Sequence, residues 1–138
     1  MRFMILVKAT ADSEAGKFPP QEEMEKLVSD MAKFHEELQK AGALLDGSGL
    51  KPSSAGWRVQ YSSGKPVVID GPFAETKELV AGYTLIQVKS REEALEWSRR
   101  FPNPSGEGKA AQIEVRELYE LDDFGPDAAD RLRGIGLK

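Results

Sequence analysis

The spacing of apolar residues along the chain predicts alternating strands and helices. Residues 3–7 are a continuous apolar run, which is typical of a strand buried on both faces. Between Met24 and Leu38, apolar residues recur every three or four positions. This pattern predicts a helix that begins after Pro19-Pro20 and ends at Gly42, because proline suits the first turn and glycine suits a left-handed cap.

The same reading predicts a hairpin and a second helix in the rest of the chain. Residues 11–18 are polar and irregular, and residues 122–138 are mostly small and charged, so we expect one domain at 1–121 followed by a tail that docks or stays loose. The expected elements are strands at 43–46, 57–61, 67–69, 80–88 and 111–115, a turn at 62–65, and a helix opened by a Ser90–Glu93 capping box and stopped at Pro102.

This order of elements predicts an α+β fold, a ferredoxin-like α/β sandwich. Two helices can cover only one face of its sheet, yet the strand at 80–88 carries apolar residues on both sides. Leaving the second face wet would forgo much of the energy of the core. We therefore expect a second copy to close it, giving a homodimer with a dimeric α/β barrel.

Composition narrows the class of protein. The 138 residues are 40% hydrophobic and 30% charged, with a net charge of -4 and no cysteine. This composition fits a soluble domain and excludes disulfides, thiolate nucleophiles and cysteine-based metal sites. We expect no nucleic-acid partner because the chain is acidic, and no membrane partner because no apolar run approaches a membrane span. The lack of cysteine suits a cytoplasmic protein. We also expect no cofactor and no metal.

Residues 70–78 are the densest stretch of candidate chemistry. They place three acids, one base and one hydroxyl in a Gly-Pro turn between two apolar strands. Asp70 and Glu75 are candidate acid–base residues, because a carboxyl group in a cleft can exchange protons with a substrate. The structural alternative for Asp70 is a turn in which its carboxylate caps its own backbone.

Four neighbouring residues are candidates for substrate binding. Arg58 could neutralise one of the acids or grip a substrate carboxylate, although a solvated strand charge is its default role. Thr76 could orient an acid. Lys77 could form a surface ion pair with Glu75 or Glu78, or the three side chains could converge on a cleft.

The chain has one histidine, His35, on the apolar side of the first long helix. It could act as a general base that faces the cleft. The alternative is a histidine at the edge of the core, hydrogen-bonded to a strand. A lone histidine without cysteine makes a poor set of zinc ligands.

The stretch Asp70-Gly71-Pro72-Phe73-Ala74-Glu75-Thr76-Lys77-Glu78 resembles the signature of the YCII-related proteins, in the branch called DGPF. Further pieces, among them Phe34-His35-Glu36-Glu37-Leu38 and Gly82-Tyr83, extend the resemblance over residues 1–118. It implies a ferredoxin-like fold that dimerises into a barrel, distantly like muconolactone isomerase. It also implies a catalytic His–Asp pair in the wider family. The matching positions hold Met31 and Phe101 here.

Two hypotheses for function follow. The first is an enzyme of the isomerase, lyase or dehalogenase type that transfers protons without a cofactor in a dimer cleft. The second is a non-catalytic module that binds a ligand or a partner. The resemblance links this second hypothesis to transcriptional regulation, because some relatives are encoded beside sigma factors.

Overall fold

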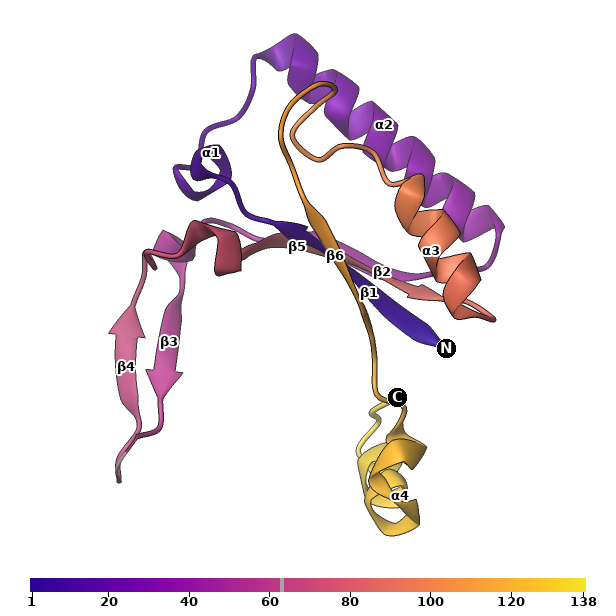
Figure 1. Ribbon diagram of the computed structural model, residues 1–138. Helices are drawn as coiled ribbons and strands as arrows, with labels where there is room; N and C mark the ends of the chain where they lie inside the picture. The colour runs from indigo at the N-terminus through magenta and orange to yellow at the C-terminus, as the bar shows by residue number, and fades with distance from the viewer. Residues whose placement is uncertain (63) are drawn as a thin grey trace.

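The computed structural model describes residues 1–62 and 64–138, and its centre is a four-stranded antiparallel sheet. The strands lie in the order β2 (Leu44–Gly49), β5 (Val80–Gln87), β1 (Arg2–Lys8) and β6 (Ile113–Glu117). Helices α2 (Gln21–Lys40) and α3 (Arg91–Arg99) both lie on one face of this sheet (Figure 1). The expected α+β fold is confirmed, and its sheet is antiparallel.

Local signals explain where the two long helices begin and end. Acidic residues occupy the first turn of α2, where the helix dipole favours negative charge, and Gly42 follows its end with φ +72°. Ser90 caps α3 by accepting a hydrogen bond from the Glu93 amide. The Glu93 carboxylate accepts from the Lys89 amide instead of the Ser90 amide, so the expected reciprocal box is only half formed.

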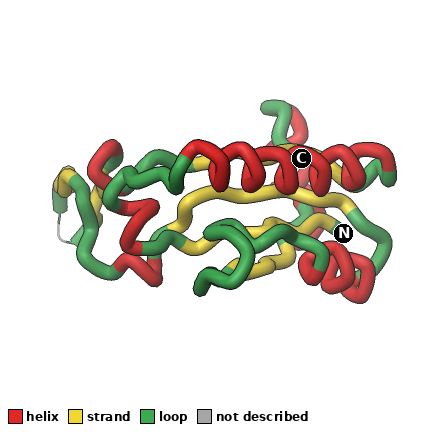
Figure 2. The backbone as a smooth tube through the Cα atoms, turned by 90° about the horizontal axis from the view of Figure 1, so that it is seen from above, coloured by secondary structure: helices red, strands yellow, loops and turns green. Residues whose placement is uncertain are grey.

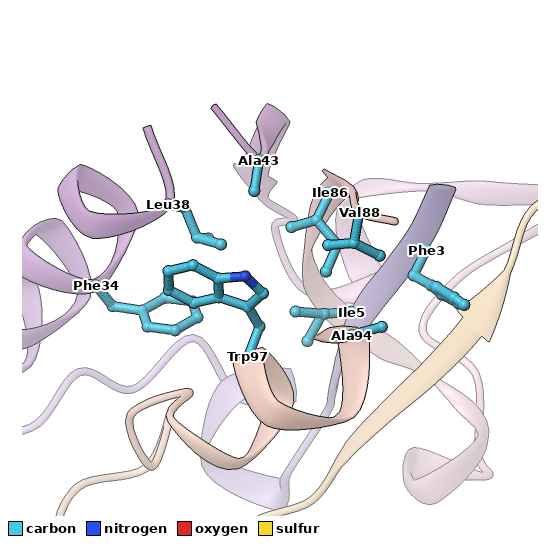
Figure 3. Close-up of a cluster of buried hydrophobic side chains, with 9 residues drawn as sticks. All are labelled: Phe3, Ile5, Phe34, Leu38, Ala43, Ile86, Val88, Ala94 and Trp97. Carbon is cyan, nitrogen blue, oxygen red and sulfur yellow. The ribbon is translucent and has the colours of Figure 1, made fainter. Parts of the chain in front are cut away.

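The core fills the space between these helices and the sheet (Figure 3). Phe34 belongs to this core and packs edge-on against the rings of Trp97 and Phe101, at centroid distances of 6.0 and 5.2 Å. Such edge-to-face pairs add to the stabilisation that burial alone gives. The buried residues of this cluster are Phe3, Ile5, Phe34, Leu38, Ala43, Ile86, Val88, Ala94 and Trp97.

The hairpin of β3 (Trp57–Gln60) and β4 (Val67–Asp70) forms a separate two-stranded sheet. All eight residues of its strands are exposed. In Figure 1 the hairpin extends away from the face that carries α2 and α3, and Figure 2 shows it at one end of the molecule. An isolated two-stranded hairpin is only marginally stable in water. This hairpin lacks the third strand that usually stabilises such a pair. Ser63, within the turn expected at 62–65, lies outside the described residues.

The structure adds helices where the sequence predicted none. Residues 11–14 form α1 (Ala11–Glu14), capped by reciprocal hydrogen bonds between Thr10 and Ser13. The segment beyond residue 120 forms a 3₁₀ turn, η3 (Leu121–Phe124), and helix α4 (Pro126–Gly134). The Arg2 side chain donates to the Glu120 carboxylate at 3.2 Å and to the Lys138 carbonyl at 3.0 Å, which ties the tail to β1.

Candidate functional site

Gly71, within the 70–78 motif, holds together the two ends of the hairpin. The Gly71 amide donates to the Gly56 carbonyl at 3.0 Å. A Cβ at position 71 would lie 1.9 Å from the Ser53 carbonyl oxygen, a separation at which the backbone would have to move. Only glycine therefore fits here, and the reason is the close approach of two backbone segments.

A second set of contacts joins the same motif to α1. The Phe73 amide donates to the Ser53 hydroxyl oxygen at 3.0 Å. That hydroxyl donates to the Glu14 carboxylate, which also accepts from the Ser53 amide at 2.9 Å. The chain Glu14–Ser53–Phe73 thus links three segments that are far apart in sequence, and the middle of the motif serves as a structural joint.

The register of the hairpin separates Arg58 from Asp70, one of the acids that Arg58 was a candidate to neutralise. Asp70 lies opposite Trp57, and Arg58 lies opposite Ile69. Cross-strand partners share a face, so Asp70 and Arg58 point to opposite faces of the hairpin. The Arg58 guanidinium instead stacks on the Phe73 ring, 3.8 Å from its centroid, in a cation–π contact.

The remaining residues of the motif do not gather into a charged cluster. Glu75, Lys77 and Glu78 are exposed, and Thr76 is half-buried. Among residues 1–62 and 64–138, no ion pair within 4.0 Å includes any of the three charged side chains. The surface ion pair that the sequence allowed is therefore not formed within the described chain.

His35 joins α2 to the sheet, well away from the motif in the chain. Its Nδ1 lies 2.7 Å from the Met31 carbonyl oxygen, which can only accept, so Nδ1 carries the proton. In the neutral ring, Nε2 then accepts from the hydroxyl of buried Thr84 at 2.8 Å. The ring also packs against Phe101, with centroids 6.4 Å apart. His35 thus lies between the two positions to which the resemblance assigns a catalytic pair, and both of its nitrogens are engaged.

The face of the sheet that α2 and α3 leave uncovered carries an apolar centre. Side chains alternate along a strand, so the neighbours of the core residues Phe3, Ile5 and Ile86 point to this opposite face, which we call the open face. Its centre is formed by four half-buried residues, and its edges carry acidic, basic and hydroxyl groups. The central residues are Met4, Leu6, Tyr83 and Leu85, and the edge residues are Asp46 and Ser48 on β2 with Glu114 and Arg116 on β6.

A tyrosine–carboxylate pair lies at the β2 side of the open face. The Tyr83 hydroxyl donates to the Asp46 carboxylate at 2.9 Å. This hydrogen bond, and then the negative charge of Asp46, raise the pKa of the Tyr83 hydroxyl above its usual value. Asp46 is not among the candidates drawn from the sequence, and Tyr83 enters there only through the resemblance. The two residues are 37 positions apart, and only the strand register brings them together.

Two hollows of the surface lie away from these residues. One of about 540 Å³ separates α2 from residues 100–109 and is lined by ion-paired side chains such as Lys26 and Lys109. Another, of about 580 Å³, lies between α2 and Phe18. Neither is lined by Asp70, Glu75 or His35. Within residues 1–62 and 64–138, no group of three or more histidine, aspartate or glutamate side chains is arranged to hold a metal ion.

Comparison with known proteins decides the family. Residues 1–121 match the family described as YCII-related domain. The chain belongs to the YCII-related family. An uncharacterized protein of Rhizobium meliloti (strain 1021) is 33% identical to this YCII-related chain over 99 residues, which is 72% of this chain and 80% of the relative.

A solved structure with a related outline is the 5-chloro-2-hydroxyhydroquinone dehydrochlorinase of Burkholderia phenoliruptrix AC1100, in complex with 2,5-dihydroxybenzoquinone. The likeness covers 86% of this YCII-related chain and 94% of the dehydrochlorinase, with a TM-score of 0.43 and 12% identity. Because the TM-score is below 0.5, this likeness carries no functional inference. No helix in the described part of the chain has the length and apolar character that crossing a membrane requires.

Proposed function

We propose that this YCII-related protein is a homodimeric enzyme that transfers protons on a small organic molecule without a cofactor, in a cleft between two facing sheets. In this proposal the ferredoxin-like sandwich of one copy places its open face against that of a second copy, giving a dimeric α/β barrel. The reaction is of the isomerase, lyase or dehalogenase type. The regulatory alternative depends on the resemblance alone, and no contact among residues 1–62 and 64–138 adds support to it.

The observation that carries the proposal is the excess surface of the single chain. The chain exposes 10025 Å², whereas a compact monomer of 15.2 kDa should expose about 7,100 Å². The excess of about 2,900 Å² exceeds what one partner contributes even to a large homodimer interface, roughly 1,000–2,500 Å². A second copy can therefore cover most of this surface.

The exposed apolar residues lie where a second copy would cover them. Trp57 is 65% exposed and Tyr61 is 78% exposed on the hairpin, and four further hairpin residues are large, apolar and exposed. Hairpin and open face lie on the same side of the sheet, opposite α2 and α3 (Figure 1). Apolar patches of this extent are typical of interfaces between protein chains.

The chemistry of the proposed cleft comes from the Asp46–Tyr83 pair. Once the open face is covered, the Tyr83 hydroxyl and the Asp46 carboxylate lie at the β2 side of its apolar centre. A carboxylate can accept a proton from a carbon acid, and the hydrogen bond from the Tyr83 hydroxyl holds the Asp46 carboxylate in place for that role. Asp70, Glu75 and His35 remain competing candidates for the same roles.

The dimer is tested by introducing one charge at the centre of the open face. Leu85→Glu is expected to raise the dimer dissociation constant at least about 100-fold, because an unpaired carboxylate would be buried in the interface. Leu95→Glu, at an exposed position on α3, is the matched control and should leave the constant unchanged. Sedimentation equilibrium measures both. A monomeric wild-type protein at micromolar concentration would contradict the dimer.

The reaction class is tested by following carbon-bound protons. We expect the protein to exchange such protons for deuterium in D2O on a member of a panel of small enolic and aromatic acids, followed by NMR. Asp46→Asn should slow the exchange at least about 100-fold, as expected for loss of a general base. If Asp70→Asn, Glu75→Gln or His35→Gln has that effect instead, the site is theirs. If no panel member exchanges, the proton-transfer proposal fails.

A further inference from the structure

We propose that the second copy lies with its β6 edge over β2, so that Asp46 of one protomer meets Arg116 of the other. The two-fold axis of this dimer runs along the strands. The inference rests on the proposed function, since it requires the dimer, and it adds which residue the partner contributes to the site.

The register of the sheet places opposite charges at the two ends of one row. Reading across the open face from β2 to β6, this row consists of Asp46, Leu85, Met4 and Arg116. The neighbouring row consists of Ser48, Tyr83, Leu6 and Glu114. Each row therefore has an apolar middle and polar ends, and in the first row the two ends carry opposite charges.

Two aligned sheets can face each other through a two-fold axis in only two directions. An axis across the strands puts each edge over the same edge of the partner. Asp46 then faces a second Asp46 or the partner's Ser48, depending on where the axis crosses the strands. An axis along the strands puts β2 over β6 and keeps each row over itself. Only the axis along the strands brings Asp46 to an opposite charge, so charge complementarity favours this axis.

The contacts that this arrangement brings together are complementary in both rows. In the first row Asp46 faces the partner's Arg116, and Met4 faces the partner's Leu85. In the second row Ser48 can donate its hydroxyl to the partner's Glu114, while Tyr83 packs on the partner's Leu6. Facing sheets lie about 10 Å apart, a gap that opposing long side chains span. Arg116 is already oriented by Glu114 of its own chain, at 3.2 Å.

The arrangement also completes the site. Within one chain, Asp46 accepts a hydrogen bond from Tyr83 and has no ion pair among the described residues. The partner's Arg116 supplies the missing positive charge. An arginine also binds carboxylate or enolate oxygens in a forked contact, so the substrate class it favours is a small organic acid or enol.

Chemical crosslinking tests the arrangement directly, because the chain has no cysteine and every introduced thiol is the only one. Asp46→Cys and Arg116→Cys proteins are refolded together from urea and treated with a short bifunctional maleimide. We expect covalent dimers in the mixture and none in either protein alone. Ser48→Cys with Glu114→Cys is a second pair with the same expectation, and it leaves the Asp46–Arg116 contact intact.

The outcomes separate this inference from the proposed function. Crosslinking of Asp46→Cys with itself would show the other axis and overturn the inference, while the dimer would stand. Absence of crosslinks from both pairs in a sample that sediments as a dimer would overturn it as well. A wild-type protein that sediments as a monomer would overturn the dimer and the inference together.

Discussion

Gly71→Ala is expected to destabilise the protein by about 3 kcal/mol or more, because its new methyl group would overlap the Ser53 carbonyl. Neither backbone segment can yield without loss of a hydrogen bond. The Gly71–Gly56 bond and the Phe73–Ser53 bond both hold this joint, each at 3.0 Å. We therefore expect the hairpin to detach from α1, and the proposed dimer to weaken as a result. Equilibrium unfolding in urea and proteolysis of the hairpin measure the two effects.

Gly56→Ala is the control for this change. Gly56 lies beside the same carbonyl, but a Cβ there would be 3.8 Å from it, an ordinary contact. Its backbone is extended, with φ -128°, which any residue adopts. We expect a change of at most about 1 kcal/mol. Equal stability of the two variants would show that the close approach at position 71 relaxes without cost.

Phe34→Ala is expected to lower the free energy of unfolding by about 3–5 kcal/mol, the usual cost of removing a buried phenylalanine ring. The side chain is only 4% exposed, and its ring contacts Trp97, Phe101 and His35. The vacated volume lies between α2, α3 and the sheet (Figure 3), where the packed elements cannot collapse into it. Thermal and urea unfolding followed by circular dichroism measure the loss.

Phe18→Ala removes the same ring from a position that is 78% exposed. The free energy of unfolding should change by at most about 0.5 kcal/mol, because the ring is largely exposed and its removal changes little buried apolar surface. The difference between the two variants isolates the contribution of the buried Phe34 ring to the free energy of unfolding. Similar losses in both would mean that Phe18 is covered in solution, which would place it in an interface.

The periodic elements could be predicted from the sequence, because a buried face requires apolar residues at regular spacing. The run at residues 3–7 became β1, and the helical spacing from Met24 to Leu38 became most of α2. Both elements bury their apolar residues against the same core. The four residues of α1 are too few to show a period, and their stability comes from the Thr10–Ser13 cap.

The candidate site was harder to predict, because it depends on pairing between distant segments. Residues 70–78 carried a strong signal, but the groups that fix them, Glu14 and Ser53, carry no local pattern. The Asp46–Tyr83 contact depends on a register shift between Leu44 and Asp46. A shift of one residue moves a side chain to the other face, and no reading of the strand alone reveals it.

The separate two-stranded hairpin has a consequence for the turnover of the protein in a cell. In the proposed dimer the second copy covers the hairpin, so the stability of each chain depends on the protein concentration, by mass action. A scarce or newly synthesised chain would display bare strand edges and aromatic rings to proteases and to aggregation partners. Its lifetime should therefore grow with its own concentration.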